Sequence, residues 1–72
     1  MKKTYTLIDL DCANCAAKME RNIKKIDGVH DATVSFFAQK LILDADDARF
    51  EEILKAAVDA VHRVDADCRV KL

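Results

Sequence analysis

The chain has 72 residues, enough for one domain whose core is only just large enough to fold without help from a metal, a disulfide or very regular packing. Hydrophobic residues make up 51% of the chain and proline is absent, a composition that excludes a disordered segment. Twelve basic and thirteen acidic residues leave a net charge of −1 without long runs of either sign, so nothing favours nucleic acid or an anionic membrane as a partner.

The N-terminal segment MKKTYTLIDLD has neither the continuous apolar region nor the small-residue cleavage site of a secretion signal. No apolar run approaches the roughly 20 residues that a membrane-spanning helix needs. We therefore expect a soluble, cytoplasmic protein. Its three cysteines, an odd number, favour metal or redox chemistry over structural disulfides in that reducing compartment.

The first half of the chain predicts a strand, a loop, a helix and a second strand. Residues 3–8 are rich in strand-forming side chains, and residues 9–14 break that pattern. Apolar side chains then recur at helical spacing and predict a helix that ends at Asp27-Gly28, with these positions facing the core: Ala16, Met19, Ile23 and Ile26. Residues 31–37 alternate between apolar and polar side chains and predict the second strand.

The second half predicts a strand, a helix and a last strand. Residues 40–44 follow the short link Phe37-Ala38-Gln39, which indicates a hairpin. A strongly amphipathic helix begins after Asp46-Asp47, either of which suits the N-cap, and residues 68–72 alternate again. The order β-α-β-β-α-β predicts the α+β class, with a split βαβ arrangement of four antiparallel strands and two helices on one face.

Cys12 and Cys15 lie where the first strand gives way to the first helix. Two intervening residues let both sulfurs face one point, and a helix N-terminus stabilises the thiolates that bind metal, with Lys18 adding positive charge. A redox dithiol is an alternative, although a thioredoxin-type site typically has Trp or Pro near the pair and the chain has neither. Half of a structural zinc site is another, to be completed from Cys68, His30 and His62.

The stretch IDLDCANCAAKMERNIKKIDGVHDATVSFFAQKLIL strongly resembles the heavy-metal-associated domain. Cys12 and Cys15 match the ligand cysteines of its G-M-x-C-x-x-C motif, and Gly28-Val29 match its helix-closing pair. The resemblance covers residues 1–72 and implies one domain with a ferredoxin-like βαββαβ fold. Asp9 and Leu10 replace the usual Gly and Met of the motif, and we expect Leu10 to pack beneath the loop as that Met does.

Asp11, just before the first cysteine, bears on the choice of metal. The resemblance implies that Thr or Ser at this position suits Cu⁺, whereas a D-C-x-x-C sequence is similar to that of zinc, cadmium and lead exporters. A carboxylate adds a harder ligand and a negative charge, which favours Zn²⁺, Cd²⁺ or Pb²⁺. The alternative role for Asp11 is to cap the helix N-terminus.

Four other residues invite attention. Cys68 and Met19 lie at apolar positions of their elements and are interpreted as core residues. His30 is expected on the surface at the end opposite the cysteines. His62 suits the end of the second helix, and a supporting role near the site stays open for it or for a neighbour, because the loop that follows returns to the metal-site end.

The resemblance implies a regulatory or delivery domain at the N-terminus of a zinc-, cadmium- or lead-exporting P-type ATPase in the cell membrane. The expected partners are other metal-binding domains or the membrane-embedded part of that transporter, with metal passed on by ligand exchange. The pump's D-K-T-G and Cys-Pro-Cys sequences are not in this chain, so we expect no catalytic residues and no ATPase activity from it alone. The alternatives are a free-standing Cu⁺ metallochaperone and a thiol–disulfide oxidoreductase.

Overall fold

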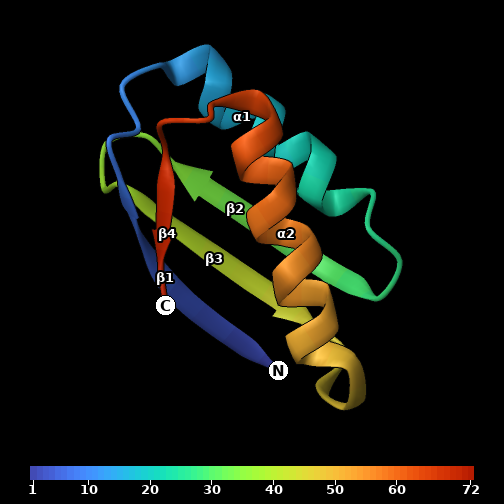
Figure 1. Cartoon of the computed structure of the whole chain (residues 1–72). Coiled ribbons are helices and arrows are strands. Elements are labelled where there is room, and N and C mark those ends of the chain that lie inside the picture. The colour runs from blue at the N-terminus through green and yellow to red at the C-terminus, as the bar shows by residue number, and fades with distance from the viewer.

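The computed structural model describes all 72 residues, and its element order is the one expected from the sequence (Figure 1). A single 3₁₀ turn, Asp47–Arg49, precedes the second helix. The strands and helices are β1 (Lys2–Ile8), α1 (Ala13–Lys24), β2 (Val29–Ser35), β3 (Lys40–Ala45), α2 (Phe50–Val64) and β4 (Arg69–Lys71).

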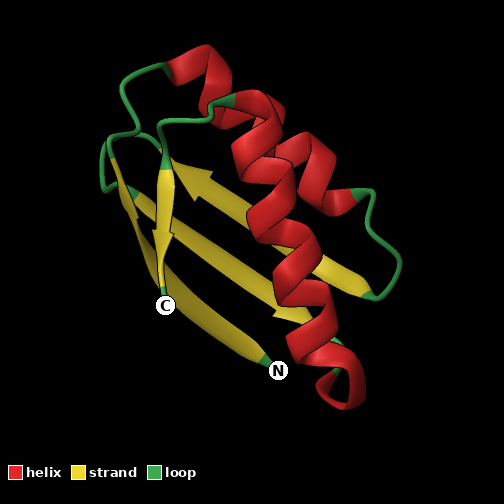
Figure 2. Ribbon diagram, in the orientation of Figure 1, coloured by secondary structure: helices red, strands yellow, loops and turns green.

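The four strands form one sheet in the order β2-β3-β1-β4, and every neighbouring pair is antiparallel. Both helices cover the same face of this sheet (Figure 2). The prediction of an α+β, ferredoxin-like fold is therefore confirmed. No helix in the structure is both long and apolar enough to cross a bilayer.

The strand directions bring three connections to one end of the sheet. The β1–α1 loop, the β2–β3 hairpin and the α2–β4 loop all lie at the end where β1 finishes (Figure 1). The N-terminus lies at the other end, and β4 runs away from the β1–α1 loop because it is antiparallel to β1. The cysteine pair is thus at a tip formed by loops.

The core between sheet and helices is entirely apolar. Fifteen residues are buried and none of them is polar or charged. The apolar stripe predicted for the first helix is confirmed, except that Ile26 lies beyond the end of α1 and is only half-buried. The buried side chains of the two helices are Ala16, Met19, Ile23, Phe50, Ile53, Ala57 and Val61.

The end of α1 and both ends of β2 differ from the predictions. Helix α1 ends at Lys24, and a turn over Lys25–Asp27 reaches Gly28, whose φ of +94° is the left-handed conformation expected of that glycine. Strand β2 begins at Val29, two residues earlier than predicted, and contains a bulge between Val29 and Asp31. It also ends two residues early, because the hairpin turn uses Gln39 at φ 54° as its left-handed residue.

Helix α2 and strand β4 are present as predicted, but the predicted Asp46 or Asp47 cap does not stand on α2 itself, because α2 begins at Phe50 after Arg49, which makes no side-chain cap bond. Asp46 is the N-cap of the 3₁₀ turn, and its Oδ1 accepts the Ala48 N–H at 3.2 Å. Strand β4 is shorter than predicted: Cys68 precedes it, and Leu72 follows it with 78% of its surface exposed. A three-residue strand at the sheet edge leaves few unpaired backbone groups.

Candidate metal centre

The segment before the cysteines is a tight turn out of β1. Asp9 has φ 64°, a left-handed conformation that glycine adopts without strain and that Asp tolerates better than most residues. This explains why Gly is usual at this position in the family that the motif resembles. Leu10 then turns inward and is only 3% exposed, so the expectation that it packs beneath the loop is confirmed.

Cys12 is the N-cap of α1. Its backbone is extended, with φ −136° and ψ 116°, and its Sγ accepts the Cys15 N–H at 3.2 Å. An N-cap side chain satisfies one of the backbone donors that the first helical turn leaves unpaired. The alternative in which Asp11 caps this helix is therefore wrong, since Cys12 occupies that position.

The two thiols differ in acidity. The pKa of Cys12 is lowered, first by a hydrogen bond with the Cys15 side chain and then by backbone N–H groups at Cys15 and Asn14. The pKa of Cys15 is raised by the same side-chain hydrogen bond, by burial, and by the negative charges of Cys12 and Asp65, while Lys18 opposes the shift. The expected thiolate stabilisation at the helix N-terminus thus acts on Cys12 and not on Cys15.

Asp11 is exposed and belongs to an acidic rim next to the cysteines, which we define as Asp9, Asp11, Asp65 and Asp67. These four carboxylates and Arg69 line a depression of about 430 Å³ between the β1–α1 and α2–β4 loops. No three His, Cys, Asp or Glu side chains in the structure are close enough together to hold a metal ion. Cys12, Cys15 and Asp11 therefore share one end of the fold without forming a three-ligand cluster.

Asp65 was not singled out from the sequence. The negative charge of Asp65 helps to raise the pKa of both Cys15 and Cys68, because the α2–β4 loop returns to the cysteine end. The signal that could have found it is the Asp65-x-Asp67 pair immediately after the second helix. The side chain of Asp65 accepts the Asp67 N–H at 3.0 Å, which shapes this loop.

The remaining residues considered from the sequence lie where they were expected. Cys68 and Met19 are fully buried, and burial is the main cause that raises the pKa of the Cys68 thiol. His30 is exposed near the start of β2, at the end away from the cysteines. His62 is exposed in the last turn of α2.

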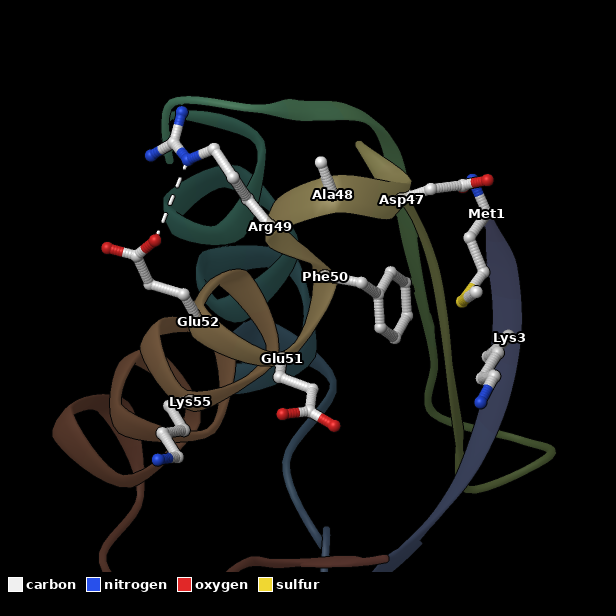
Figure 3. A pocket seen from close by; sticks show the side chains of 9 residues that line it. All are labelled: Met1, Lys3, Asp47, Ala48, Arg49, Phe50, Glu51, Glu52 and Lys55. Atoms are coloured by element: carbon white, nitrogen blue, oxygen red, sulfur yellow. Dashed lines mark ion pairs between the residues drawn. The ribbon is translucent and has the colours of Figure 1, made fainter.

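A larger depression, of about 580 Å³, lies at the opposite end of the molecule (Figure 3). Two ion pairs lie among its lining residues: Arg49 with Glu52 at 3.6 Å, and the Met1 amine with Asp47. It contains no cysteine or histidine. Size alone therefore does not make it the functional site, and the chemistry-bearing residues lie at the other end.

Known proteins with sequences similar to this chain include metal-transporting ATPases. A probable cadmium-transporting ATPase of Staphylococcus aureus is 39% identical over 69 residues, covering 86% of this chain and 9% of that protein. A cadmium, zinc and cobalt-transporting ATPase of Bacillus subtilis (strain 168) is 32% identical over 71 residues, covering 99% of this chain and 10% of that protein. The chain spans about a tenth of the length of these relatives.

Among solved structures, the N-terminal domain of the copper(I) ATPase PacS in its apo form superimposes with a TM-score of 0.78 at 26% identity. The superposition covers 100% of this chain and 92% of that one. The model of the heavy-metal-associated domain matches residues 4–66, which include both cysteines and Asp11. The chain therefore belongs to the heavy-metal-associated domain family, a family of metal-binding domains.

Proposed function

We propose that this chain captures a divalent heavy-metal ion, Zn²⁺, Cd²⁺ or Pb²⁺, on Cys12, Cys15 and Asp11 and passes it to a partner site. The observation that carries the proposal is the placement of both cysteines at the first turn of α1, with the Cys15 N–H donating to Cys12 Sγ at 3.2 Å. Donors of this kind stabilise a thiolate, which is the form of cysteine that binds metal. Family membership supports the same chemistry.

The preference for a divalent ion rests on Asp11 and its surroundings. Asp11 is exposed and makes no hydrogen bond or ion pair, so its carboxylate is free to turn toward a cation held by the cysteines. The acidic rim sets four carboxylates against the single guanidinium of Arg69 in the same depression, and such a field concentrates cations. A carboxylate ligand also favours Zn²⁺-type ions over Cu⁺, which prefers soft sulfur donors.

Transfer of the metal follows from incomplete coordination. Two thiolates and one carboxylate are fewer than the four ligands of a closed structural zinc site. An incoming thiolate of a partner can therefore bind the ion before Cys12 or Cys15 leaves it. The metal then moves through a shared intermediate by exchange of ligands, with no change in its oxidation state.

The parent molecule that fits this role is a P-type ATPase that exports zinc, cadmium or lead from the cell. Residues 1–72 would form its cytoplasmic N-terminal regulatory or delivery domain, and the ion would pass to another such domain or to the membrane-embedded part. The metal-transporting relatives support this assignment, since this chain matches only about a tenth of each. By itself the segment is expected to hydrolyse no ATP.

A Cu⁺ chaperone or copper-ATPase domain is the second candidate. The observation in its favour is the close superposition on the N-terminal domain of a copper(I) ATPase. The two cysteines alone satisfy the soft, low-coordinate demand of Cu⁺. The two candidates therefore differ in whether Asp11 touches the metal.

The deciding experiment is a competitive titration of the reduced chain with Zn²⁺, Cd²⁺, Pb²⁺ and Cu⁺, repeated on Asp11→Ala. If Asp11 is a ligand, its removal weakens binding of the divalent ions at least about tenfold, the lower bound for loss of a group that supports a metal site, and leaves Cu⁺ affinity unchanged.

The matched control is Asp67→Ala, which removes the same charge from the same depression. Equal losses in Asp11→Ala and Asp67→Ala mean that Asp11 acts only through its charge. If Cu⁺ binds more tightly than the divalent ions and Asp11→Ala does not change its affinity, the copper candidate is supported. Both candidate functions require that Cys12→Ser and Cys15→Ser no longer bind metal.

A further inference from the structure

Gln39, at the end of the β2–β3 hairpin, is bonded to the backbone of the loop that carries the cysteines. Its Oε1 accepts the Leu10 N–H at 3.1 Å, and its Nε2 donates to the Leu10 carbonyl at 2.6 Å. Nε2 also donates to the Phe36 carbonyl at 2.7 Å, and the Gln39 carbonyl accepts the Leu7 N–H at 2.7 Å. One residue therefore ties the hairpin to both the end of β1 and the turn that follows it.

The chemistry of these contacts requires a primary amide in one orientation. The amide has one acceptor oxygen and two donor hydrogens, and the partners are one N–H and two carbonyl groups. Turning the amide over would place its oxygen against two carbonyl oxygens. A glutamate at this position would have the right shape but would repel both carbonyls when ionised.

Leu10 stands directly before Asp11 and Cys12, so the position of its peptide sets where those two residues begin. The Leu10 side chain anchors the loop from below at 3% exposure, while the Gln39 amide anchors its backbone from the side. No other side chain forms a hydrogen bond with the backbone of residues 9–11. On the far side of Cys12, helix α1 itself holds the chain.

We propose that Gln39 is a positioning residue of the metal centre: its two hydrogen bonds to the Leu10 backbone hold Asp11 and Cys12 within reach of an ion bound at Cys15. This inference rests on the proposed metal-binding function and adds to it a residue 27 positions beyond Cys12 in the sequence. Gln39 does not touch the metal. It lowers the cost of ordering the loop when the ion binds, which is the usual contribution of groups that support metal ligands.

The test is the Cd²⁺ affinity of Gln39→Gly, alone and combined with Asp11→Ala. Glycine adopts φ 54° without strain, so the hairpin turn is kept while the amide is removed. We expect Cd²⁺ to bind about tenfold more weakly to Gln39→Gly. We also expect Asp11→Ala to cost less affinity in the Gln39→Gly background than in the parent, because an unpositioned carboxylate contributes less. If Gln39 had a purely structural role, the fold-losses of Cd²⁺ affinity in the two single variants would multiply in the double variant.

Ser35→Ala is the matched control. Ser35 Oγ accepts the Ala38 N–H at 3.1 Å within the same turn and forms no hydrogen bond with the cysteine loop, so its loss is expected to weaken the hairpin and leave Cd²⁺ affinity at the parent value. Titrations are made at a temperature at which circular dichroism shows all variants folded.

Parent-like Cd²⁺ affinity in Gln39→Gly, or losses that multiply in the double variant, would overturn this inference while leaving the proposed function intact. Failure of the parent chain itself to bind Cd²⁺ would overturn both. A measurement that needs no variant is hydrogen exchange of the Leu10 amide in the parent, which we expect to be protected. Exchange of the Leu10 amide at the rate of an amide without a hydrogen bond would also contradict the proposal.

Discussion

Asp9, Gly28 and Gln39 are the three residues with positive φ, and they lie at the points where the chain reverses around the sheet. Asp9 and Gln39 belong to the cysteine end, where their turns are bonded to each other through Leu7 and Leu10. Gly28 belongs to the opposite end, between α1 and β2. Of the three, Gly28 tolerates substitution least, because a side chain added there would meet the core residue Ile53.

Gly28→Ala is expected to lower the free energy of unfolding by about 1–3 kcal/mol, the cost of holding a non-glycine residue in a strained conformation. Its φ is +94°, and an added Cβ would lie 2.6 Å from Cδ1 of Ile53, closer than carbon atoms approach. Urea denaturation of the metal-free, reduced protein measures the change.

Ile53→Val separates the two causes, because it removes the Cδ1 methyl that the new Cβ would meet. In that background Gly28→Ala should cost less, and the remainder is the contribution of the backbone angle. An equal cost in both backgrounds would show that the side-chain clash is relieved by movement of Ile53. No cost in either would contradict the prediction.

The two cysteines at the start of helix α1 have different surroundings, although they look equivalent in the sequence. Cys12 is the N-cap and its Sγ accepts the Cys15 N–H, whereas Cys15 lies in the first turn, where the negative charge of Asp65 helps to raise its pKa. Cys68, next to β4, is fully buried. The three thiols therefore differ in burial and in the direction of their pKa shifts.

We expect iodoacetamide to modify Cys12 first, Cys15 second and Cys68 last in the metal-free, reduced protein. The pKa of Cys12 is lowered, so its thiolate forms at lower pH than that of Cys15, whose pKa is raised. Cys68 combines a raised pKa with complete burial. Tandem mass spectrometry after short exposures across a pH series measures the order.

In urea the three cysteines should react at similar rates, since the hydrogen bonds and burial that distinguish them are lost. Faster modification of Cys15 than of Cys12 in the folded protein would contradict the assignment of Cys12 as the accepting sulfur. Modification of Cys68 at the rate of Cys12 would show that the core opens readily at β4.

The elements were predictable because their signals are local. Alternation marked the strands, and the amphipathic pattern marked helix α2, whose buried residues all lie on its apolar stripe. The errors are at boundaries: α1 stops at Lys24 and β2 starts at Val29, where a bulge and a glycine turn replace the regular pattern. Such ends are decided by tertiary hydrogen bonds as much as by propensity.

The candidate site was predictable to a similar degree. The spacing of Cys12 and Cys15 and the preceding Asp11 were visible in the sequence, while whether they bind metal stays a prediction. Gln39 and Asp65 were not recognised as neighbours of the site, because their approach depends on how the sheet closes. The bonds of Gln39 to Leu10 join residues 29 positions apart, and no local pattern specifies such a pair.

Metal binding should stabilise the whole molecule, since a folded site that the unfolded chain lacks draws the folding equilibrium toward the native state. At a free Cd²⁺ concentration about 100 times the dissociation constant, the expected gain is about 2.7 kcal/mol. For a domain of this size each kcal/mol raises the Tm by about 4–8 °C. Thermal unfolding followed by circular dichroism, with and without Cd²⁺, measures the shift.

Excess chelator should return the Tm to the metal-free value. The double variant Cys12→Ser/Cys15→Ser should fold and show no Cd²⁺-dependent shift, since both side chains are only half-buried and Ser is also a good N-cap residue. A shift of parental size in that variant would place the metal elsewhere, for example on the acidic rim. No shift in the parent would contradict metal binding by this chain.

The direction of β1 and β4 has a practical consequence for how the domain can be joined to other things. β1 begins at the end of the sheet far from the cysteines, and β4 runs away from them. A fluorescent tag, a resin surface or a neighbouring domain fused at the N-terminus therefore leaves the cysteine loop uncovered at the opposite end of a body 32 Å long. On a flexible linker, the cysteine loop of this domain can reach the cysteine loop of a second domain without obstruction by the linker.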